Sequence, residues 1–496
     1  MNAVTPIEEC LDVIIVGAGI SGIGMAVHLT RDCPGKRFAI IERREQLGGT
    51  WDLFRYPGIR SDSDMHTLGF AFAPWKHEKA IADGPAILEY LDAITDEYRL
   101  RERMRFGQKV LSAAWDSKTA RWTVEIETQD GSLQRLQGRF LFLGAGYYDY
   151  DNPFEAGFKG KDKFKGTVIH PQFWPKDFDH TGKKVVVIGS GATAVTIVPA
   201  LADSGAGQVT MLQRTPTWIM SRPAKDAIAN NLRKFLPEKL AYAITRAKNI
   251  LLGDLMFKRS RNQPEKVKQF LEAQLREHLG PDYDREAFTP PYNPWEQRLC
   301  FVPDADLFRV LNSGQADVVT DHIDSFDAKG IKLKSGKHLD ADVIVTATGL
   351  KVAVAGKIAV SVDGQPVDFA QQFYYRNCMF SNVPNLALVF GYLNASWTLR
   401  VDIIAEYLTR LFNQMDVFGA VVATPVMPKG SEPEDVDIFD FSSGYIQRGK
   451  HLMPRNAAAL PWRLSQDYRL DRKEMRHAPI DDGIMQFTRA KELVSA

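Results

Sequence analysis

Two glycine-rich segments of the same type place the strongest limit on how this chain can fold. Residues 17–22 read GAGISG and residues 189–194 read GSGATA. Each follows a continuous apolar run, at residues 13–16 and 184–188, and each precedes apolar residues at helical spacing. A buried strand, a tight glycine turn and a helix in this order form the phosphate-binding part of a dinucleotide-binding unit. The sequence therefore predicts an α/β fold with two Rossmann-like three-layer domains.

The first segment has the spacing of a complete adenine-dinucleotide site. Gly17 permits the tight turn, Gly19 lets the backbone approach a pyrophosphate, and Gly22 lets the helix pack closely on the strand. A second strand, predicted at residues 38–41, ends at Glu42, which stands twenty residues after Gly22. An acidic side chain at this spacing accepts hydrogen bonds from an adenosine ribose. A glycine-rich turn that binds no ligand is the alternative.

The second segment departs from the first at two positions. Ala194 stands in place of the third glycine, a substitution that this motif tolerates. Arg214 stands twenty residues later, where the first segment has an acid, and a guanidinium there can hold a 2′-phosphate through two hydrogen bonds. We therefore predict NADPH at this site, with a plain surface arginine as the alternative. The predicted NADPH-binding residues are Gly189, Gly191, Ala192, Thr193, Arg214 and Thr215.

The linker between the two segments carries a third pattern, F-x-G-x-x-x-H-x-x-x-W-P, formed by Phe164, Gly166, His170, Trp174 and Pro175. This pattern resembles the fingerprint of type I Baeyer–Villiger monooxygenases. Simpler flavin monooxygenases carry a similar stretch that ends in Tyr or Phe, so Trp174 and Pro175 favour the first branch. An ordinary buried loop is the alternative, because Gly and Pro mark loops in any protein.

The resemblance implies FAD in the first domain, NADPH in the second, and a C4a-peroxyflavin as the oxidant. The implied activity is insertion of one oxygen atom of O2 next to a ketone carbonyl, which gives an ester or lactone, with oxidation of sulfides or thioamides as a side activity. The alternative within the family is a simple flavin monooxygenase that oxygenates nitrogen or sulfur only. Outside it, the alternatives are a disulfide reductase and a membrane-docking or nucleotide-sensing protein with a structural flavin.

Two loops of the first domain also match this family. Residues 55–62 (RYPGIRSD) match the loop whose aspartate, here Asp62, lies near the flavin and pairs with the active-site arginine. Residues 48–51 (GGTW) match a flavin-contacting loop, and a core aromatic is the alternative for Trp51. The implied FAD-binding residues are Gly17, Gly19, Gly22, Glu42, Gly49, Thr50, Trp51 and Asp62.

The family's active-site arginine follows a lysine. Arg298 matches the arginine, whereas Gln297 departs from the lysine, which implies a less strict selectivity for NADPH. Arg309, on a predicted helix, is the weaker rival for the catalytic position. Residues 395–398 (ASWT) and the helix predicted at 399–415 look closest to the ethionamide-activating branch of the family. The implied catalytic residues are Arg298 and Asp62.

The composition excludes several classes of protein. A chain of 496 residues with 45% hydrophobic residues and a net charge of +1 has no general attraction for nucleic acid. The apolar run at residues 13–27 contains glycines and is too short to cross a bilayer, so we expect no export or transmembrane segment. The cysteines have no C-x-x-C or zinc spacing, which predicts a cytoplasmic protein without a disulfide or a metal site. They are Cys10, Cys33, Cys300 and Cys378.

Residues 222–285 differ in character from the rest of the chain. They contain fourteen Lys and Arg residues against eight Asp and Glu residues, with apolar residues at helical spacing. We predict two or three helices inserted into the NADPH domain, with solvated basic faces or with weak peripheral contact to an anionic membrane. The predicted organisation is an FAD domain (1–150), a linker (151–180), an NADPH domain (181–221 and 286–340), the helical insertion (222–285), and a second FAD segment with the C-terminal tail (341–496).

Shorter patterns predict individual elements. Residues 85–104 read as an amphipathic helix, and residues 110–128 and 136–143 alternate like strands. An apolar strand at residues 342–349 is expected to lead back into the FAD domain. The tail after Trp462 is polar and carries no structural signal. Neither the oligomeric state nor the particular ketone or sulfide substrate is predicted.

Overall fold

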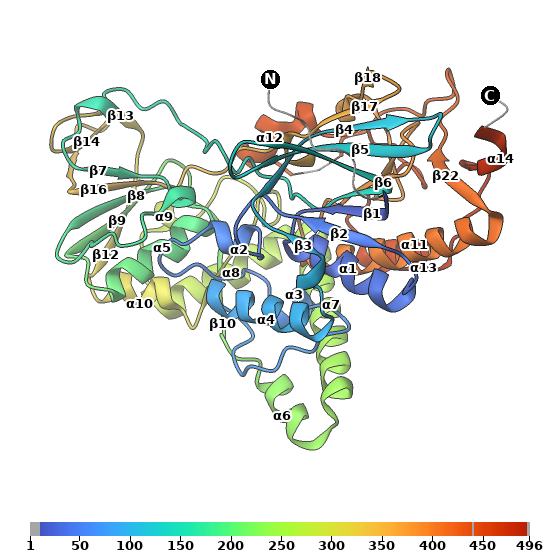
Figure 1. Cartoon of the computed structure of the whole chain (residues 1–496). Helices are drawn as coiled ribbons and strands as arrows, with labels where there is room; N and C mark the ends of the chain where they lie inside the picture. The colour runs from blue at the N-terminus through green and yellow to red at the C-terminus, as the bar shows by residue number, and fades with distance from the viewer. Residues whose placement is uncertain (1–9, 439–440, 494–496) are drawn as a thin grey trace.

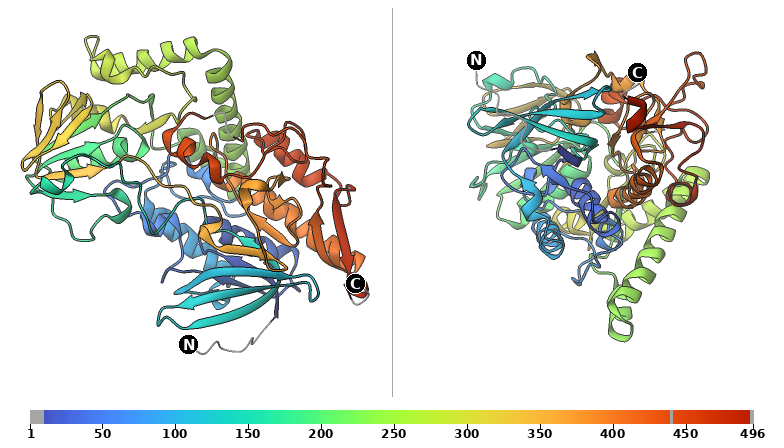
Figure 2. Two further views of the ribbon diagram at one scale, coloured as in Figure 1. Left: turned by 90° about the horizontal axis from the view of Figure 1, so that it is seen from above. Right: turned by 45° about the vertical axis from the view of Figure 1, so that its right-hand side comes forward.

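Two sheets built on parallel strands lie side by side, and a helical arm projects from below them (Figure 1). The structure is a computed structural model that describes residues 10–438 and 441–493. The larger sheet lies on the side of both chain termini, and the smaller one on the opposite side (Figure 2). This arrangement confirms the prediction of two Rossmann-like domains.

The larger sheet has β1 at its centre, between β6 and β2, with all three strands parallel. β1 and β2 are buried because they lie between layers on both faces of the sheet. On one face, the helices α1 (Ile20–Asp32) and α11 (Trp397–Phe418) pack against each other. The strands of this sheet are β1 (Cys10–Val16), β2 (Phe38–Ile41), β3 (Met104–Arg105), β4 (Gln108–Asp116), β5 (Arg121–Thr128), β6 (Leu133–Leu143), β17 (Ala359–Val362), β18 (Gln365–Pro366), β19 (Tyr374–Tyr375), β20 (Met379–Phe380) and β21 (Leu386–Leu388).

The smaller sheet is entirely parallel, in the order β12-β9-β8-β16-β7. One face packs against α5 (Ala192–Asp203) and the other against a small antiparallel sheet. Along β8, Val185 and Val187 face the helical side and Val186 and Ile188 face the antiparallel sheet, as expected for alternating side chains. The strands are β7 (Thr167–Ile169), β8 (Lys184–Ile188), β9 (Gln208–Gln213), β12 (Ala316–Thr320) and β16 (Val343–Thr346), and the antiparallel sheet contains β13 (Ile323–Phe326), β14 (Gly330–Leu333) and β15 (His338–Asp340).

Two strands of the smaller sheet come from outside the predicted NADPH segments. β7 lies in the predicted linker, and β16 lies in the segment that we assigned to the FAD domain from residue 341 onward. β16 pairs with both β7 and β8, and all four of its residues are buried. The boundary at residue 341 was therefore wrong, because an apolar strand gains most by taking a place inside a sheet with both neighbours paired.

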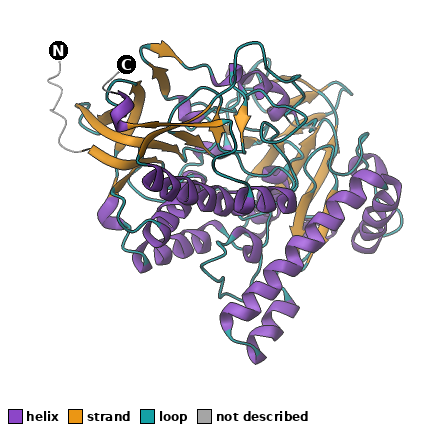
Figure 3. Cartoon of the chain, turned by 90° about the vertical axis from the view of Figure 1, so that its right-hand side faces the viewer, coloured by secondary structure: helices purple, strands orange, loops and turns teal. Residues whose placement is uncertain are grey.

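The segment predicted as a helical insertion contains three helices, and a short fourth helix begins at its last residue, Arg285. The chain enters and leaves it through two paired parallel strands, β10 and β11. The Asp226 side chain accepts a hydrogen bond from the Ala229 N–H, which begins the first helix. Figure 3 shows the long helix of the insertion running diagonally away from the body. These elements are β10 (Ile219–Arg222), α6 (Ala227–Phe235), α7 (Glu238–Asn262), α8 (Pro264–Leu279), α9 (Arg285–Phe288) and β11 (Cys300–Pro303).

Two local predictions need correction. The helix predicted at residues 85–104 ends at Glu97, because Arg99 adopts a left-handed backbone conformation with φ +52°. The pattern at residues 110–128 is two strands that pair in a hairpin, with Ala120 at φ +49° in the turn. We call the part of the chain around the larger sheet the first lobe and the part around the smaller sheet the second lobe. Further helices of the first lobe are α2 (Thr50–Leu53), α3 (Met65–Leu68) and α4 (Gly84–Glu97), and α10 (Asp306–Asn312) belongs to the second lobe.

The C-terminal tail, whose polar sequence carries no recognisable pattern, is a structural part of the first lobe. Helix α13 packs against α11, and its Asp471 is fully buried against the fully buried Arg400, at 2.9 Å. The Tyr392 hydroxyl donates a second hydrogen bond to Asp471, at 2.7 Å. The tail contains α13 (Tyr468–His477), β23 (Met485–Arg489) and α14 (Ala490–Leu493), and it follows β22 (Ala420–Pro425) and α12 (Gly444–Gly449) in the chain.

Asp471→Ala is expected to lower the free energy of unfolding by about 3 to 5 kcal/mol, because it leaves the Arg400 guanidinium buried without its carboxylate. Urea denaturation of the FAD-loaded protein measures the change. Arg469→Ala on the same helix is the control, since Arg469 is 58% exposed and should change the free energy by less than about 0.5 kcal/mol. Equal effects of the two substitutions would contradict this account of the tail.

Candidate active site

A cavity of about 1060 Å³ lies between the two lobes, where the carboxyl ends of β1 and β8 meet. Ligands of open α/β sheets bind at this end of the strands. The cavity brings together most of the residues predicted from both glycine segments. Those that line it are Gly17, Gly19, Glu42, Gly49, Thr50, Trp51, Asp62, His170, Gly189, Gly191, Ala192, Thr193, Arg214, Thr215 and Arg298. Gly22 does not line it, because Gly22 packs against the turn itself: a Cβ there would lie 1.8 Å from the Gly17 carbonyl oxygen.

Both glycine turns leave a helix N-terminus open to the cavity. Gly19 and Gly191 begin α1 and α5 without a side-chain cap, and neither helix has an acid in its first turn. A Cβ added at Gly191 would have no atom within 4 Å, so this position faces open space. Unpaired N–H groups and the positive end of the helix dipole favour an anion here. The residues present therefore fit two dinucleotide pyrophosphates, one on each turn.

The Glu42 side chain, at the end of β2, is hydrogen-bonded to the first glycine turn. One carboxylate oxygen accepts a hydrogen bond from the Ala18 N–H at 2.7 Å, and the other accepts one from the Arg44 N–H at 2.9 Å. Burial raises the pKa of Glu42, and these donors oppose the rise. Because each carboxylate oxygen can accept a second hydrogen bond, Glu42 can also hold a ribose hydroxyl.

The loop at residues 55–62 reaches from the first lobe to the second. Gly58 has φ +76°, and a Cβ there would lie 2.6 Å from the Cβ of Ala200 in α5. Arg60 forms an ion pair with Asp306 of α10. At the end of the loop, Asp62 lies 3.2 Å from Nε of Arg298. The predicted pairing of Asp62 with Arg298 is therefore present in the structure.

Three tyrosines surround the Arg298 guanidinium in the cavity. Burial disfavours its charge, but the Asp62 carboxylate and the phenols of Tyr445, Tyr147 and Tyr148 raise the pKa of Arg298 above its ordinary value. Burial also raises the pKa of each phenol, which keeps all three protonated at neutral pH. The hydroxyl oxygens of Tyr147 and Tyr148 lie 2.5 Å apart. The group therefore combines one fixed cation with several neutral hydroxyl donors.

Trp397 and Trp51 also line the cavity, and we call these two residues and the three tyrosines the aromatic wall. The Trp397 ring stacks on Tyr147 with centroids 5.2 Å apart, and its Nε1–H donates to the Ser21 hydroxyl at 2.9 Å. Tyr147 and Tyr148 had a partial signal in the sequence, since they directly follow the GAG run at residues 144–146. Tyr445 had no signal, because it comes from a distant segment that only folding brings into the cavity.

Two arginines named as candidates have different surroundings. Arg214 lines the cavity just past β9, where the Ser190 hydroxyl donates to the Thr215 carbonyl at 2.7 Å. Arg309 instead pairs with Asp203 on the surface, at 2.6 Å, and does not line the cavity. The structure therefore removes Arg309 as a rival to Arg298.

The linker fingerprint is mainly a packing element. Phe164 is buried in the core beside the smaller sheet, and Trp174 packs edge-on against Phe178. A Cβ at Gly166 would lie 2.3 Å from the Asp342 carbonyl oxygen, so this glycine allows β7 to pass close to β16. His170 is the fingerprint residue that lines the cavity, and Phe164, Gly166, Trp174 and Pro175 do not.

The His170 ring begins the turn that follows β7. Its Nδ1 accepts a hydrogen bond from the Gln172 N–H at 3.2 Å, which requires that Nδ1 carry no proton. Burial lowers the pKa of His170. The unfolded chain therefore binds a proton at His170 at a higher pH than the folded chain does. As the pH falls through about 6.5, this difference lowers the free energy of unfolding.

His170→Asn is expected to flatten the loss of stability between about pH 7 and pH 5, because Asn keeps the cap acceptor but does not titrate. The difference from wild type should not exceed about 1.4 kcal/mol per pH unit. Urea midpoints measured across this range provide the test. His451→Asn, at an exposed histidine, is the control and should leave the pH dependence unchanged.

The fold and the cavity define the class of protein: a two-dinucleotide oxidoreductase of the flavoprotein type. A family model described as pyridine nucleotide-disulphide oxidoreductase matches residues 14–250. All four cysteines lie in the described residues, and none of them forms a disulfide in the structure.

Relatives over the full length narrow the class. The chain is 49% identical over 490 residues to a probable FAD-binding monooxygenase, AlmA, of Acinetobacter baylyi, covering 98% of both chains. It is 48% identical over 482 residues to the FAD-containing monooxygenase EthA of Mycobacterium tuberculosis, covering 97% of this chain and 98% of that one. The chain belongs to the family of FAD-containing monooxygenases, which confirms the resemblance seen in its sequence.

Solved structures share the fold. An oxidized steroid monooxygenase bound to NADP superimposes with a TM-score of 0.76 at 21% identity, over 97% of this chain and 100% of that one. A cyclohexanone monooxygenase with bound ε-caprolactone gives a TM-score of 0.72 at 20% identity, over 97% and 100%. The predicted fold of the flavin monooxygenase type is confirmed. Together with the relatives, it makes the chain an NADPH-dependent flavoprotein monooxygenase that uses FAD.

Proposed function

We propose that this monooxygenase is of the Baeyer–Villiger type and inserts one oxygen atom of O2 next to a ketone carbonyl, to give an ester or a lactone. The observation that carries the proposal is the Asp62–Arg298 ion pair in the cavity between the two dinucleotide turns. Bound FAD, reduced by NADPH, would activate O2, from which the inserted oxygen atom comes. The residues of the chain then have to bind the ketone, stabilise developing charge and exclude water.

Arg298 is the residue that we assign to charge stabilisation. Asp62 contacts Nε of the guanidinium, so the two terminal nitrogens can donate hydrogen bonds to the ketone oxygen. Negative charge develops on that oxygen as its carbon is attacked. A preorganised donor at such an oxyanion contributes about 3 to 4 kcal/mol to lowering the barrier. Asp62 fixes the orientation of the donor and does not itself transfer a proton.

The aromatic wall is assigned to positioning and to the exclusion of water. Tyr147, Trp397 and Trp51 present flat apolar surface to the cavity, which suits a lipophilic ketone. The protonated hydroxyls of Tyr148 and Tyr445 can donate hydrogen bonds beside Arg298 without adding charge. A drier site strengthens the interaction of Arg298 with the ketone oxygen.

Each cofactor has assigned contacts in the chain. We assign the FAD pyrophosphate to the first glycine turn, its ribose to Glu42, and its flanking loops to the GGTW stretch and Asp62. We assign NADPH to the second glycine turn, with Arg214 at the 2′-phosphate. The FAD assignments are Gly17, Gly19, Glu42, Gly49, Thr50 and Trp51, and the NADPH assignments are Gly189, Gly191, Ala192, Thr193, Arg214 and Thr215.

Arg298→Ala is expected to bind FAD and to oxidise NADPH but to form ester from a ketone at least about 100-fold more slowly, because the ketone oxygen loses its cationic donor. Mass spectrometry of the products made with labelled O2 measures ester formation. Arg309→Ala is the matched control, since this surface arginine pairs with Asp203, and it should retain the wild-type rate. Ester formation at the wild-type rate by Arg298→Ala would remove Arg298 from the mechanism.

A second candidate, oxygenation of nitrogen or sulfur only, is kept because Trp174 and Pro175, the residues that favoured the ketone reaction, lie outside the cavity. We propose oxidation of sulfides or thioamides as a side activity, since a soft sulfur nucleophile does not need a donor at a carbonyl oxygen. Arg298→Ala should then lose much less sulfoxidation than ester formation. A wild-type enzyme that oxidises sulfides but no ketone in a broad panel would establish the second candidate instead.

Arg214→Ala is expected to lower the efficiency with NADPH by about tenfold to 100-fold and to leave the efficiency with NADH nearly unchanged, because only NADPH carries the 2′-phosphate. Steady-state oxidation of each nucleotide measures the ratio. Gln297→Ala is the companion variant, and it should have a smaller effect because an amide carries no charge. Equal use of both nucleotides by the wild type would contradict the role of Arg214.

A further inference from the structure

The outer face of α6 and α7 is unusually apolar for a surface that faces solvent. Phe235, at the end of α6, is 84% exposed. Beyond it, α7 presents a row of exposed leucine and isoleucine side chains. We call this set the outer stripe; it consists of Phe235 (84% exposed), Leu240 (49%), Ile244 (41%), Leu251 (40%), Leu252 (55%) and Leu255 (53%).

The spacing places most of the outer stripe on one side of the helix. Leu240, Ile244, Leu251 and Leu255 follow one another at intervals of four, seven and four residues, which aligns them along one face. The opposite face is the buried one and includes Arg246. A surface helix ordinarily turns polar residues outward, so the exposed leucine and isoleucine side chains of α7 depart from the expected pattern.

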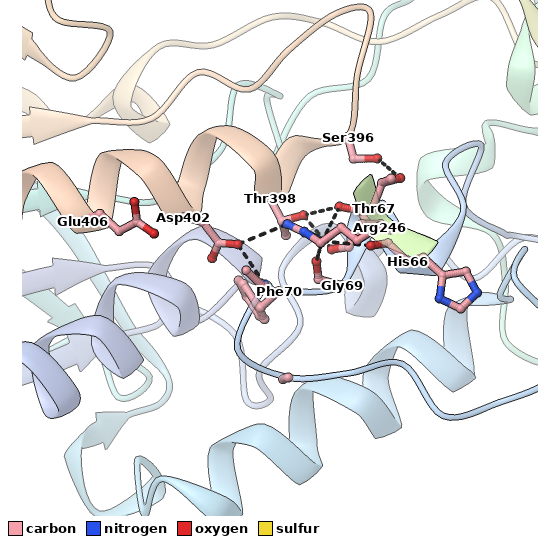
Figure 4. A network of polar contacts seen from close by, with 12 residues as sticks. His66, Thr67, Gly69, Phe70, Arg246, Ser396, Thr398, Asp402 and Glu406 are labelled. Carbon is pink, nitrogen blue, oxygen red and sulfur yellow. Dashed lines mark hydrogen bonds and ion pairs between the residues drawn. The ribbon is translucent and has the colours of Figure 1, made fainter. Parts of the chain in front are cut away.

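The inner face of α7 is held by polar contacts. Figure 4 shows the Arg246 guanidinium between backbone carbonyls of α3 and Asp402 of α11. It donates to the carbonyls of His66 at 2.9 Å, Thr67 at 3.2 Å and Gly69 at 2.5 Å, and it lies 3.2 Å from Asp402. These buried bonds fix the helix to the first lobe without help from the outer stripe. Every residue of the outer stripe is at least 40% exposed, so the stripe is available to a partner.

The charge around the outer stripe is basic. Lys234 and Lys239 are exposed next to Phe235 and Leu240. The nearby acids are neutralised, since Glu238 pairs with Lys76 at 3.3 Å and Asp254 pairs with Lys258 at 3.0 Å. An apolar stripe with flanking lysines, on an arm that projects from the body (Figures 1 and 3), complements an apolar layer behind an anionic surface.

We propose that the outer stripe inserts into the headgroup region of a bilayer that contains anionic lipid, and that it docks the monooxygenase on that surface. Exposed apolar patches of this kind mark interaction sites. Of the partners that could cover such a patch, the flanking lysines and the projecting position of the arm favour a lipid surface. Within residues 10–438 and 441–493, no helix is both long and apolar enough to cross a bilayer.

Sedimentation with vesicles tests the proposal directly. The FAD-loaded enzyme is mixed with phosphatidylcholine vesicles, either pure or with roughly 30% phosphatidylglycerol. It should sediment with the anionic vesicles and much less with the neutral ones. Raising the salt from about 0.1 M to about 1 M should weaken binding, because the Debye length falls from about 10 Å to about 3 Å.

Paired substitutions separate the two contributions. Leu251→Gln with Leu255→Gln should lower partitioning to both kinds of vesicle at least about tenfold, because the inserted apolar area is lost. Lys234→Gln with Lys239→Gln should lower partitioning about tenfold to the anionic vesicles alone. Val417→Gln is the matched control, since this valine is 78% exposed on α11 outside the arm, and it should bind like the wild type. FAD content confirms that each variant is folded.

Three results would overturn the proposal. The first is that wild type fails to sediment with anionic vesicles at low salt. The second is that the leucine pair of substitutions leaves partitioning unchanged. The third is that sedimentation velocity without vesicles shows a dimer which the leucine substitutions dissociate, because the outer stripe would then be covered by a second copy of the chain. None of these measurements depends on ketone oxidation, so each can fail independently of the proposed reaction.

Discussion

The contact on which the site depends is the ion pair between Asp62 and Arg298, because it joins the two lobes inside the cavity between them. Asp62 comes from a loop of the first lobe, and Arg298 comes from the chain just before β11 in the second. The same loop fixes its own position through the glycine contact of Gly58 on α5 and the ion pair of Arg60 with Asp306. Three contacts along eight residues therefore set the distance between the two nucleotide turns.

Buried charge fixes the rest of the first lobe in a similar way. Arg246 ties the helical arm to α3 and α11, and Arg400 ties α11 to the C-terminal helix through Asp471. In both cases a guanidinium is buried with several acceptors, so the geometry has to be met closely if the charge is to be tolerated. Helix α11, which also packs on α1, thereby connects the arm, the tail and the first glycine turn.

Most residues of the linker fingerprint lie outside the cavity, although the pattern is diagnostic in the sequence. Phe164 and Gly166 pack β7 against the core and β16, and Trp174 lies outside the cavity. His170 lines the cavity, but its Nδ1 is engaged with the backbone of its own turn. The residues of this pattern therefore mainly pack the segment that connects the lobes.

The sequence by itself determined the two glycine turns, the strands beside them, the acid Glu42 and the arginine Arg214, because these signals are local and follow from the chain geometry of a βαβ unit. It also determined the Asp62–Arg298 pair through family resemblance. The tertiary structure decided which lobe β16 joins, which residues of the fingerprint reach the cavity, and that Tyr445 lines the same cavity as Arg298. It also decided that the polar tail contributes a buried carboxylate and that α7 turns its leucines outward. These outcomes depend on contacts between segments that are distant in the sequence. A local pattern does not specify which segment will pack against a given strand, tyrosine or helix face.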